Sequence, residues 1–279
     1  MTDTDFLADM AAASRARVQA AQGELSAVEL RARAAASAVP LRLQLSPRRF
    51  DLIAEVKFRS PAAGALREGN ADSVRARVAG YADAGAVAVS VLTEPTRFDG
   101  SLQHLEAAVR ALEGRIPAMR KDFLVDPYQV CEARLAGAGG VLVIMRMLND
   151  AEVAALVECA VQLRLFVLLE AFDAADIERA ARVAKQYARS TELLIGVNSR
   201  DLVTLQVVPG RLEELVRLLP DDVPRVAESG VATGADAGRV AIAGYDVALV
   251  GGALMSALEP LQLARAMISS GRNERARRS

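Results

Sequence analysis

The sequence has few of the residues that metal, redox and nucleophilic centres require. It contains one histidine, two cysteines and no tryptophan in 279 residues. A single histidine leaves little material for a Ser-His-Asp triad or a site with several histidine ligands. Cys131 and Cys159 lie in alanine-rich helical patterns without neighbouring ligand residues, which favours reduced thiols that pack as small apolar groups. We therefore expect no metal and no cofactor.

Charge and hydropathy exclude further classes of protein. The chain has 34 basic and 35 acidic residues, a net charge of -1, so there is no electrostatic reason to expect nucleic acid or an anionic membrane as a partner. No apolar run reaches the roughly 18 residues of a membrane span, and the N-terminus lacks the basic and apolar regions of a signal peptide. These absences predict a cytoplasmic protein.

A repeated pattern of strand and helix fills most of the chain. Near-continuous apolar runs suit a parallel sheet buried on both faces, and helical patterns between them suit crossover connections. Eight regular units favour a single (β/α)8 TIM barrel over the alternative, an open doubly wound sheet. The expected strands are 52–56, 86–92, 116–119, 140–144, 165–169, 193–197, 225–227 and 247–250. The expected helices are 73–84, 102–112, 127–136, 151–163, 174–187, 211–219, 234–243 and 261–268.

The barrel is expected over residues 50–268, between two segments of different character. Residues 1–49 are expected to form an N-terminal helical extension, and residues 269–279 a flexible, basic, frayed tail. The extension cannot bury its own apolar positions, so it should cover part of the barrel. These positions are Phe6, Leu7, Met10, Val18, Leu25, Val28 and Leu30. His104 lies in an amphipathic helical pattern, where a surface position is expected.

Charged side chains stand at the ends of several expected strands. Glu55 and Lys57 are two residues apart, so both point to the same side of the first strand. Lys121, Glu170 and Glu228 follow the third, fifth and seventh strands, and the sixth strand leads into Asn198-Ser199-Arg200-Asp201. Because the carboxyl ends of barrel strands converge, these groups should form one pocket that supplies acids and bases without a metal. Burial beside another cation could lower a lysine pKa toward neutrality. Ordinary ion pairs at strand ends are the alternative interpretation.

Two pairs of residues late in the chain indicate a phosphate site. Ser229-Gly230 follows the seventh strand and Gly251-Gly252 follows the eighth. Barrels of this type bind phosphate there, through backbone N–H groups and a short helix. We therefore expect a phosphorylated small-molecule substrate.

Several motifs have the order and spacing of a known family. They are IAEVK followed by Ser60-Pro61, then SVLTEPTRFDGSLQHL, RKDFLVDPYQV, LLEAFD, IGVNSRDL, AESGV and VGGALM. RKDF-x-x-DPYQ and N-x-RDL are the most specific of these. The sequence resembles indole-3-glycerol phosphate synthase of tryptophan biosynthesis over essentially residues 51–268, and its helical extension matches that family's additional N-terminal helix.

The resemblance implies the closure of an indole ring. The substrate would be 1-(2-carboxyphenylamino)-1-deoxyribulose 5-phosphate, converted to indole-3-glycerol phosphate with loss of carbon dioxide and water. Lys121 would be the general acid at the ketone oxygen, and Glu170 would act in the dehydration. Lys57 would bind the carboxylate of the substrate or act as a general acid together with Lys121. Glu55 and Asn198 would orient these groups, and Glu228 would support them.

The resemblance also implies which residues bind the substrate. Ser229, Gly230, Gly251 and Gly252 would hold the phosphate. The substrate pocket would be shaped by Ser60, Arg200, Phe98, Phe123, Leu142 and Leu202.

The chain departs from the family pattern at a few positions. Phe58, Arg59 and Ala62 change the run after Lys57, Phe172 stands where histidine is usual, and Gly252-Ala253 replaces a more polar pair. The departures leave open a diverged copy that acts on a related anthranilate-derived sugar phosphate. A non-catalytic barrel that binds sugar phosphate is also open. A phosphoribosylanthranilate isomerase-like activity would need a Cys/Asp pair after strands one and six, and strand one offers Glu and Lys. The expected assembly is a monomer or weak homodimer.

Overall fold

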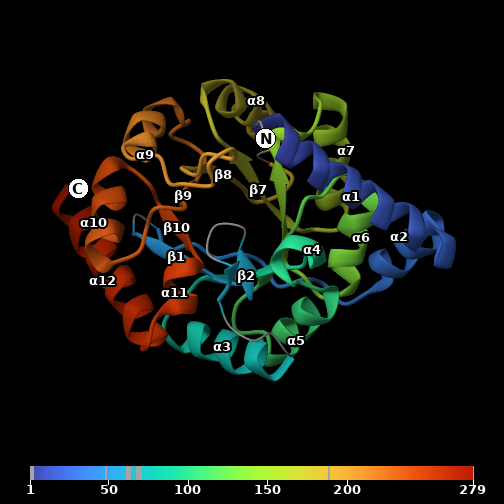
Figure 1. Cartoon of the computed structure of the whole chain (residues 1–279), viewed down its shortest axis with the longest axis horizontal. Helices are drawn as coiled ribbons and strands as arrows, with labels where there is room; N and C mark the ends of the chain where they lie inside the picture. Colours follow the sequence, from blue (N-terminus) through green and yellow to red (C-terminus); the bar gives the residue numbers. More distant parts are fainter. Residues whose placement is uncertain (1–2, 48, 61–63, 67–70, 188, 279) are drawn as a thin grey trace.

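Eight parallel strands close into a barrel with helices around it, which confirms the predicted (β/α)8 architecture (Figure 1). The computed structural model describes residues 3–47, 49–60, 64–66, 71–187 and 189–278. Pro61 and Ala62, which the sequence comparison with the family singled out, lie outside the described residues. The strands, in their order around the barrel, are β1 (Asp51–Val56), β10 (Val247–Val250), β9 (Arg225–Glu228), β8 (Leu193–Asn198), β7 (Phe166–Ala171), β6 (Gly140–Ile144), β5 (Ala118–Lys121) and β4 (Ala88–Leu92).

The barrel strands are apolar on both sides because both sides are covered. All six residues of β7 are buried, as are all five of β6. Side chains such as Ile53, Met119 and Leu168 fill the interior of the barrel, while neighbours such as Val167 and Val141 pack against the outer helices. This two-sided burial explains why the strands are continuous apolar runs rather than alternating patterns.

Each expected helix is present with differences at its ends, and the structure adds two short helices that the sequence did not predict, α4 (Pro95–Phe98) and α11 (Gly252–Ser256). The 211–219 segment is shorter as an α-helix than expected, because it ends in a turn of 3-10 helix, η2 (Val216–Leu218). A second such turn, η1 (Met145–Met147), follows β6. The helices between the strands are α3 (Ala71–Asp83), α4 (Pro95–Phe98), α5 (Leu102–Leu112), α6 (Pro127–Leu135), α7 (Asp150–Gln162), α8 (Ala174–Tyr187), α9 (Arg211–Leu215), α10 (Gly234–Ala243) and α11 (Gly252–Ser256).

The N-terminal extension consists of two helices and a connecting segment. α1 (Asp3–Glu24) crosses the upper right of the barrel in Figure 1, and α2 (Ala27–Ala36) packs beside α6. Residues 37–47 form neither helix nor strand, so the extension is helical only over its first three quarters. Its apolar positions are buried as expected, except Leu25, which is partly buried, and Val28, which is 82% exposed.

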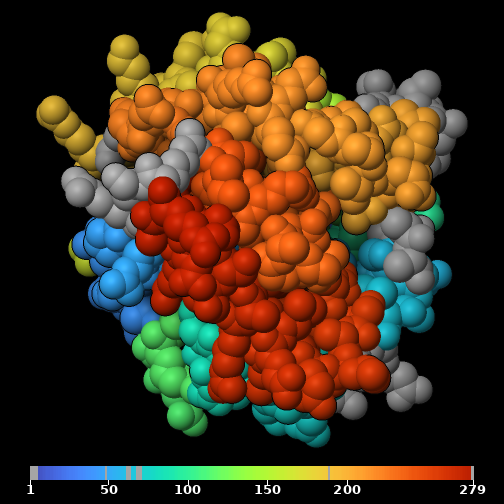
Figure 2. Space-filling view, turned by 90° about the vertical axis from the view of Figure 1, so that its left-hand side faces the viewer, coloured from blue at the N-terminus to red at the C-terminus, as the bar shows by residue number. Residues whose placement is uncertain are grey.

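The predicted frayed tail is wrong for the residues that the structure describes. The last helix, α12 (Pro260–Arg278), continues through the polar segment and packs along α10, as Figure 2 also shows. Arg272 forms an ion pair of 2.9 Å with the buried Asp51, and Arg275 pairs with Asp246 at 2.6 Å. The basic residues therefore attach the tail to the amino-terminal end of the barrel, because buried or partly buried carboxylates face them.

A short hairpin follows β1, which the sequence did not predict. β2 (Arg59–Ser60) pairs with β3 (Gly64–Ala65) in an antiparallel arrangement. Phe58, at the start of this excursion, contacts His104 of α5 edge to face, with ring centroids 5.1 Å apart. His104 is therefore half-buried rather than a free surface residue. No helix among the described residues has the length and hydropathy to cross a membrane.

Candidate active site

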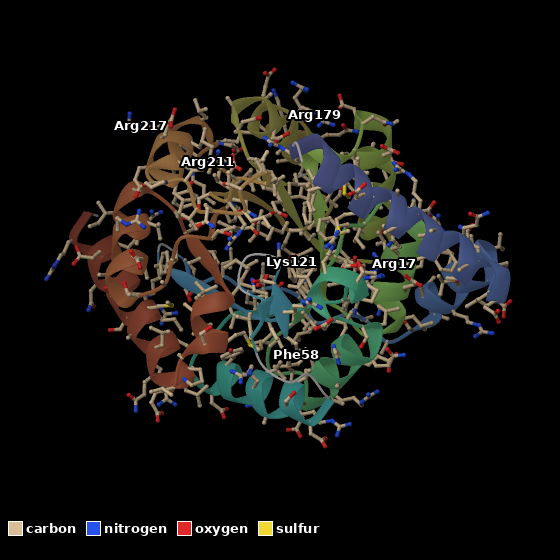
Figure 3. All side chains as sticks on the ribbon, viewed as in Figure 1. Arg17, Phe58, Lys121, Arg179, Arg211 and Arg217 are labelled. Carbon is tan, nitrogen blue, oxygen red and sulfur yellow. The ribbon has the colours of Figure 1, made fainter. Side chains whose placement is uncertain are left out.

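A pocket of about 310 Å³ opens at the carboxyl ends of the strands. It lies at the centre of the face seen in Figure 3, where Lys121 is labelled. Every residue that the sequence singled out for the site lines this pocket. These residues are Glu55, Lys57, Ser60, Phe98, Lys121, Phe123, Leu142, Glu170, Asn198, Arg200, Leu202, Glu228, Ser229, Gly230, Gly251 and Gly252.

Glu55 and Lys57 form an ion pair at the end of β1. Lys57 Nζ lies 2.6 Å from Glu55 Oε1, and both side chains are largely buried. Burial acts to raise the pKa of Glu55, but the ammonium groups of Lys57 and Lys121 outweigh it and lower that pKa. The Glu55 carboxylate fits only because Gly251 has no side chain, since a Cβ there would come within 2.1 Å of Glu55 Oε1. Gly251 thus makes room for a charged group in addition to any contact with phosphate.

Lys121 lies between two carboxyl groups at the end of β5. Its Nζ is 3.6 Å from Glu170 Oε2 and 3.5 Å from Glu228 Oε2. Burial acts to lower the pKa of Lys121, but Glu170 and Glu228 raise it above its ordinary value. The expectation of a lysine pKa lowered toward neutrality is therefore wrong for Lys121, because its nearest charged neighbours are carboxylates rather than a second cation. Lys121 is therefore a protonated ammonium near neutral pH.

The pKa of Glu228 is also raised, which in a carboxyl group favours the neutral form. Burial, and after it the negative charge of Glu170, raise the pKa of Glu228 to about 8. Its Oε1 is buried and has no hydrogen-bond partner among the described residues. It occupies a space beside Gly196, where a Cβ would come within 2.1 Å of that oxygen. An ionised carboxylate would be costly there, so Glu228 is protonated near neutral pH.

Asn198 and Arg200 fix the side of the pocket formed by β8. Asn198 Nδ2 donates to Glu170 Oε1, and Asn198 Oδ1 accepts from the backbone N–H of Arg200 at 2.9 Å. Arg200 in turn donates to the carbonyl oxygen of Leu205. These contacts orient the carboxylate of Glu170 toward Lys121.

One wall of the pocket is apolar and partly aromatic. Phe123 lies 6.1 Å from Phe98 and 5.9 Å from Phe6, measured between ring centroids. Phe6 and Leu7 come from α1, so the extension contributes to the pocket, which the sequence did not predict beyond a general covering role. Phe172, one of the departures from the family pattern, also lines the wall, and its ring lies 4.6 Å beneath the Arg146 guanidinium. The wall suits a flat aryl group.

The opposite side of the pocket is formed by backbone from the last two strand-helix connections. Ser229 and Gly230 both have left-handed φ values, 65° and 72°, which turn the chain after β9. Gly251 and Gly252 lead into α11, whose first N–H groups have no partner within the helix. A Cβ on Gly252 would meet no atom within 4 Å, so this glycine faces open space. The arrangement offers backbone donors to an anion.

Among the residues that the structure describes, no group of three or more histidine, cysteine, aspartate or glutamate side chains could hold a metal ion. Cys131 and Cys159 are buried free thiols on α6 and α7, with sulfur atoms 3.8 Å apart. They pack in the outer hydrophobic core between the two helices.

Comparisons with known proteins agree on one family. A family model described as indole-3-glycerol phosphate synthase matches residues 7–267. The indole-3-glycerol phosphate synthase of Leifsonia xyli subsp. xyli is 41% identical over 255 residues, covering 90% of this chain and 94% of the relative. The corresponding protein of Micrococcus luteus is 43% identical over 220 residues, covering 79% and 78%.

A solved structure with much lower sequence identity shows the same fold. It is the 3-hexulose-6-phosphate synthase of Salmonella typhimurium, with a TM-score of 0.61 and 14% identity, covering 81% of this chain and all of that one. That likeness concerns the barrel alone. The relationship follows from the length of the family-model match and from the sequence identity to the relatives. The chain belongs to the indole-3-glycerol phosphate synthase family.

Proposed function

We propose that this chain closes the indole ring of indole-3-glycerol phosphate, starting from 1-(2-carboxyphenylamino)-1-deoxyribulose 5-phosphate, by acid–base chemistry in this pocket. The observation that carries the proposal is the position of Lys121 Nζ, 3.6 Å from Glu170 and 3.5 Å from Glu228, with the Lys57–Glu55 pair in the same pocket. Two ammonium groups and three carboxyl groups in one cavity form a set of proton donors and acceptors that simple ligand binding would not need.

Lys121 is the proposed general acid in ring closure. The aromatic carbon that bears the carboxylate attacks the ketone carbon, and negative charge develops on the ketone oxygen. An alkoxide is a stronger base than an amine, so a proton moves from Lys121 to that oxygen even though the pKa of Lys121 is raised. Before the transfer, the ammonium also stabilises the developing charge electrostatically.

Loss of carbon dioxide and loss of water then restore aromaticity. The bond between the ring carbon and its carboxylate breaks, and carbon dioxide leaves. The new hydroxyl group then departs as water, which requires one acid to protonate it and one base to remove a proton from the ring. Glu170, oriented by Asn198, is the proposed base, and Lys57 either holds the substrate carboxylate or supplies a proton. Glu228, protonated near neutral pH, supports Lys121.

The two ends of the pocket suit the two ends of this substrate. We place the phosphate against Ser229, Gly230, Gly251 and Gly252, and the aryl ring against Phe98, Phe123, Leu142 and Leu202. Ser60 and Arg200, which also line the pocket, are proposed as further polar contacts. The intact set of acids and bases favours turnover over a non-catalytic sugar-phosphate barrel. A substituted anthranilate remains the second candidate substrate because Phe58 and Phe172 depart from the family pattern.

Substitution of Lys121 tests the proposal. The chain has only three lysines, Lys57, Lys121 and Lys185, and Lys185 is exposed on α8, so Lys185→Ala is a matched control. The chain has no tryptophan, so the fluorescence of an indole product is measured against a weak tyrosine background. We expect product formation by the wild type and Lys185→Ala without added metal, and a loss on the order of 1,000-fold or more in Lys121→Ala.

The outcomes separate the alternatives. Undiminished turnover in Lys121→Ala would remove that residue from the mechanism. A wild type that binds the product but does not form it from this substrate would favour the non-catalytic barrel or a substituted substrate. For the assembly we propose a cytoplasmic monomer or weak homodimer, which light scattering at several protein concentrations tests.

A further inference from the structure

Asp122, the residue after Lys121, is the centre of a buried polar network. Its side chain is fully buried and accepts hydrogen bonds from Thr93 Oγ1 at 2.7 Å, from Arg120 at 3.2 Å and from the backbone N–H of Phe123 at 2.8 Å. Asp122 directly follows β5 and is among the residues that line the pocket. Its partner Arg120 is the neighbour of Lys121 within β5, and neighbouring residues of a strand point to opposite faces. The network therefore holds the chain directly after Lys121.

Arg17 of α1 joins this network from a distance of 105 residues along the chain. Its NH2 lies 2.7 Å from Asp122 Oδ1 and its NH1 3.4 Å from Oδ2, a two-pronged contact between guanidinium and carboxylate. Figure 3 shows Arg17 below α1, to the right of Lys121. The Arg17 side chain is 29% exposed, whereas that of Asp122 is fully buried, so loss of Arg17 would leave a buried carboxylate with only one cation, Arg120, beside it.

Ser14 makes a second connection between α1 and the same loop. Its hydroxyl group donates to the carbonyl oxygen of Phe123 at 2.5 Å and accepts from Gln129 Nε2 at 2.8 Å. Gln129 also completes the capping box that begins α6, through Asp126. Six residues of the 122–129 segment are joined by hydrogen bonds to one another or to α1: Asp122, Phe123, Val125, Asp126, Tyr128 and Gln129. Movement of α1 would therefore disturb the chain directly after Lys121.

The same helix carries part of the pocket wall. Phe6 and Leu7 line the pocket, and Phe6 packs edge to face on Phe123. Leu7 lies ten residues, about 15 Å of helix, before Arg17. A single rigid helix therefore bears, at one end, apolar groups at the aryl side of the pocket and, near its middle, the contacts with Asp122 and Phe123.

We infer that Arg17 and Asp122 are positioning residues that hold α1 against the strand end of Lys121 and thereby complete the aryl side of the substrate pocket. The inference deepens the proposed function and rests on it for its kinetic consequences. Its mechanical part, the dependence of the 122–126 segment on Arg17, stands independently of any substrate.

The kinetic test compares two arginines of the same helix. Arg17→Met removes the contact with Asp122, and Arg15→Met removes an exposed ion pair of 3.1 Å with Glu152 of α7. We expect Arg17→Met to raise KM about tenfold, because the apolar wall is no longer held in place, with a smaller fall in kcat. Arg15→Met should stay within twofold of the wild type. Arg17→Lys should restore part of the loss, since one charged contact remains possible.

A double-substitution cycle tests whether Arg17 acts through the pocket wall. Leu7→Ala should raise KM on its own, and the same change should have little further effect once Arg17→Met is present. If the double variant instead raises KM by the product of the two single-variant factors, Arg17 does not hold Leu7 in place. Equal KM values in Arg17→Met, Arg15→Met and the wild type would overturn the inference.

Hydrogen exchange of the ligand-free protein provides a measurement that does not depend on turnover. Arg17→Met should increase amide exchange both in α1 and in residues 122–126, and Arg15→Met should leave residues 122–126 unchanged. Increased exchange confined to α1 would mean that the contact only docks the helix, and the positioning role would be wrong. A wild type that is inactive on the proposed substrate but shows the expected exchange would refute the proposed function and support the mechanical coupling.

Discussion

Gly196 lies directly beside Glu228, so closely that a single methyl group at Gly196 would come within 2.1 Å of the buried Glu228 Oε1. The two residues belong to neighbouring strands, β8 and β9, whose register pairs Gly196 with Val226 and Asn198 with Glu228. Gly251 stands in the same relation to Glu55. Two of the three carboxyl groups of the site thus occupy spaces that glycine keeps open.

Gly196→Ala should displace the Glu228 carboxyl group from this space toward Lys121 or out of the site. We expect a loss of roughly 1 to 3 kcal/mol of stability, as for other overpacked interiors. We also expect kcat to fall by about 100-fold, because the partner of the proposed general acid, Lys121, is misplaced. Gly23→Ala is the control, since a Cβ there meets no atom within 4 Å. Steady-state kinetics and urea unfolding of both variants decide the matter, and wild-type kcat in Gly196→Ala would show that the position of Glu228 does not matter.

Glu228→Gln should change how stability depends on pH. The pKa of Glu228 is raised from 4.5 to about 8, so between these values the native protein binds a proton that the unfolded chain has lost. The contribution of this group to stability is therefore present at low pH and is lost as pH rises to about 8. We expect the stability of the wild type relative to Glu228→Gln to fall by roughly 2 to 4 kcal/mol between pH 5 and pH 8.

Urea unfolding of the two proteins at several pH values measures this difference. His104, whose pKa is lowered by burial, is present in both proteins, so its effect on the stability difference cancels. Parallel stability curves from pH 5 to pH 8 would contradict a protonated Glu228 in the native state.

Arg272→Ala should destabilise the barrel although the residue lies in a polar, C-terminal segment. Arg272 pairs with Asp51, which is 1% exposed, and its Nε donates to the carbonyl oxygen of Phe50 at 3.1 Å. Removal leaves a buried carboxylate without its cation, so we expect a loss of roughly 2 to 3 kcal/mol. Arg277→Ala breaks an exposed pair with Glu274 and should cost less than about 0.5 kcal/mol. Thermal and urea unfolding compare the two, and equal losses would mean that the tail is not anchored through Asp51.

The regular part of the fold followed from local patterns in the sequence. Strands such as β6 and helices such as α5 and α8 begin and end where the apolar runs and helical periodicity placed them. The polar residues at the strand ends could be located for the same reason, because barrel topology brings all carboxyl ends to one face. Glu55, Lys57, Lys121 and Glu170 therefore needed no long-range information to be selected.

The contacts that α1 makes at the pocket could not be predicted from local sequence patterns. Nothing local marks Arg17 or Ser14 as different from Arg15, since all three stand in the same alanine-rich helix, and only packing against residues more than 100 positions away distinguishes them. The prediction that residues 269–279 form a frayed tail was wrong for a related reason. Its polar, basic sequence indicates fraying in isolation, and the buried Asp51 that holds Arg272 lies 221 residues earlier.

The architecture and the kinds of groups in the pocket could be predicted from the chain, because strand and helix periods and residue chemistry are local properties. Protonation states and precise neighbours depend on how the chain folds. The pKa of Lys121 is raised rather than lowered because the carboxyl groups of Glu170 and Glu228, from β7 and β9, lie 3.6 and 3.5 Å from its Nζ. Charge interactions of this kind depend on distances of 3 to 4 Å between distant parts of the chain, which only the closed barrel sets.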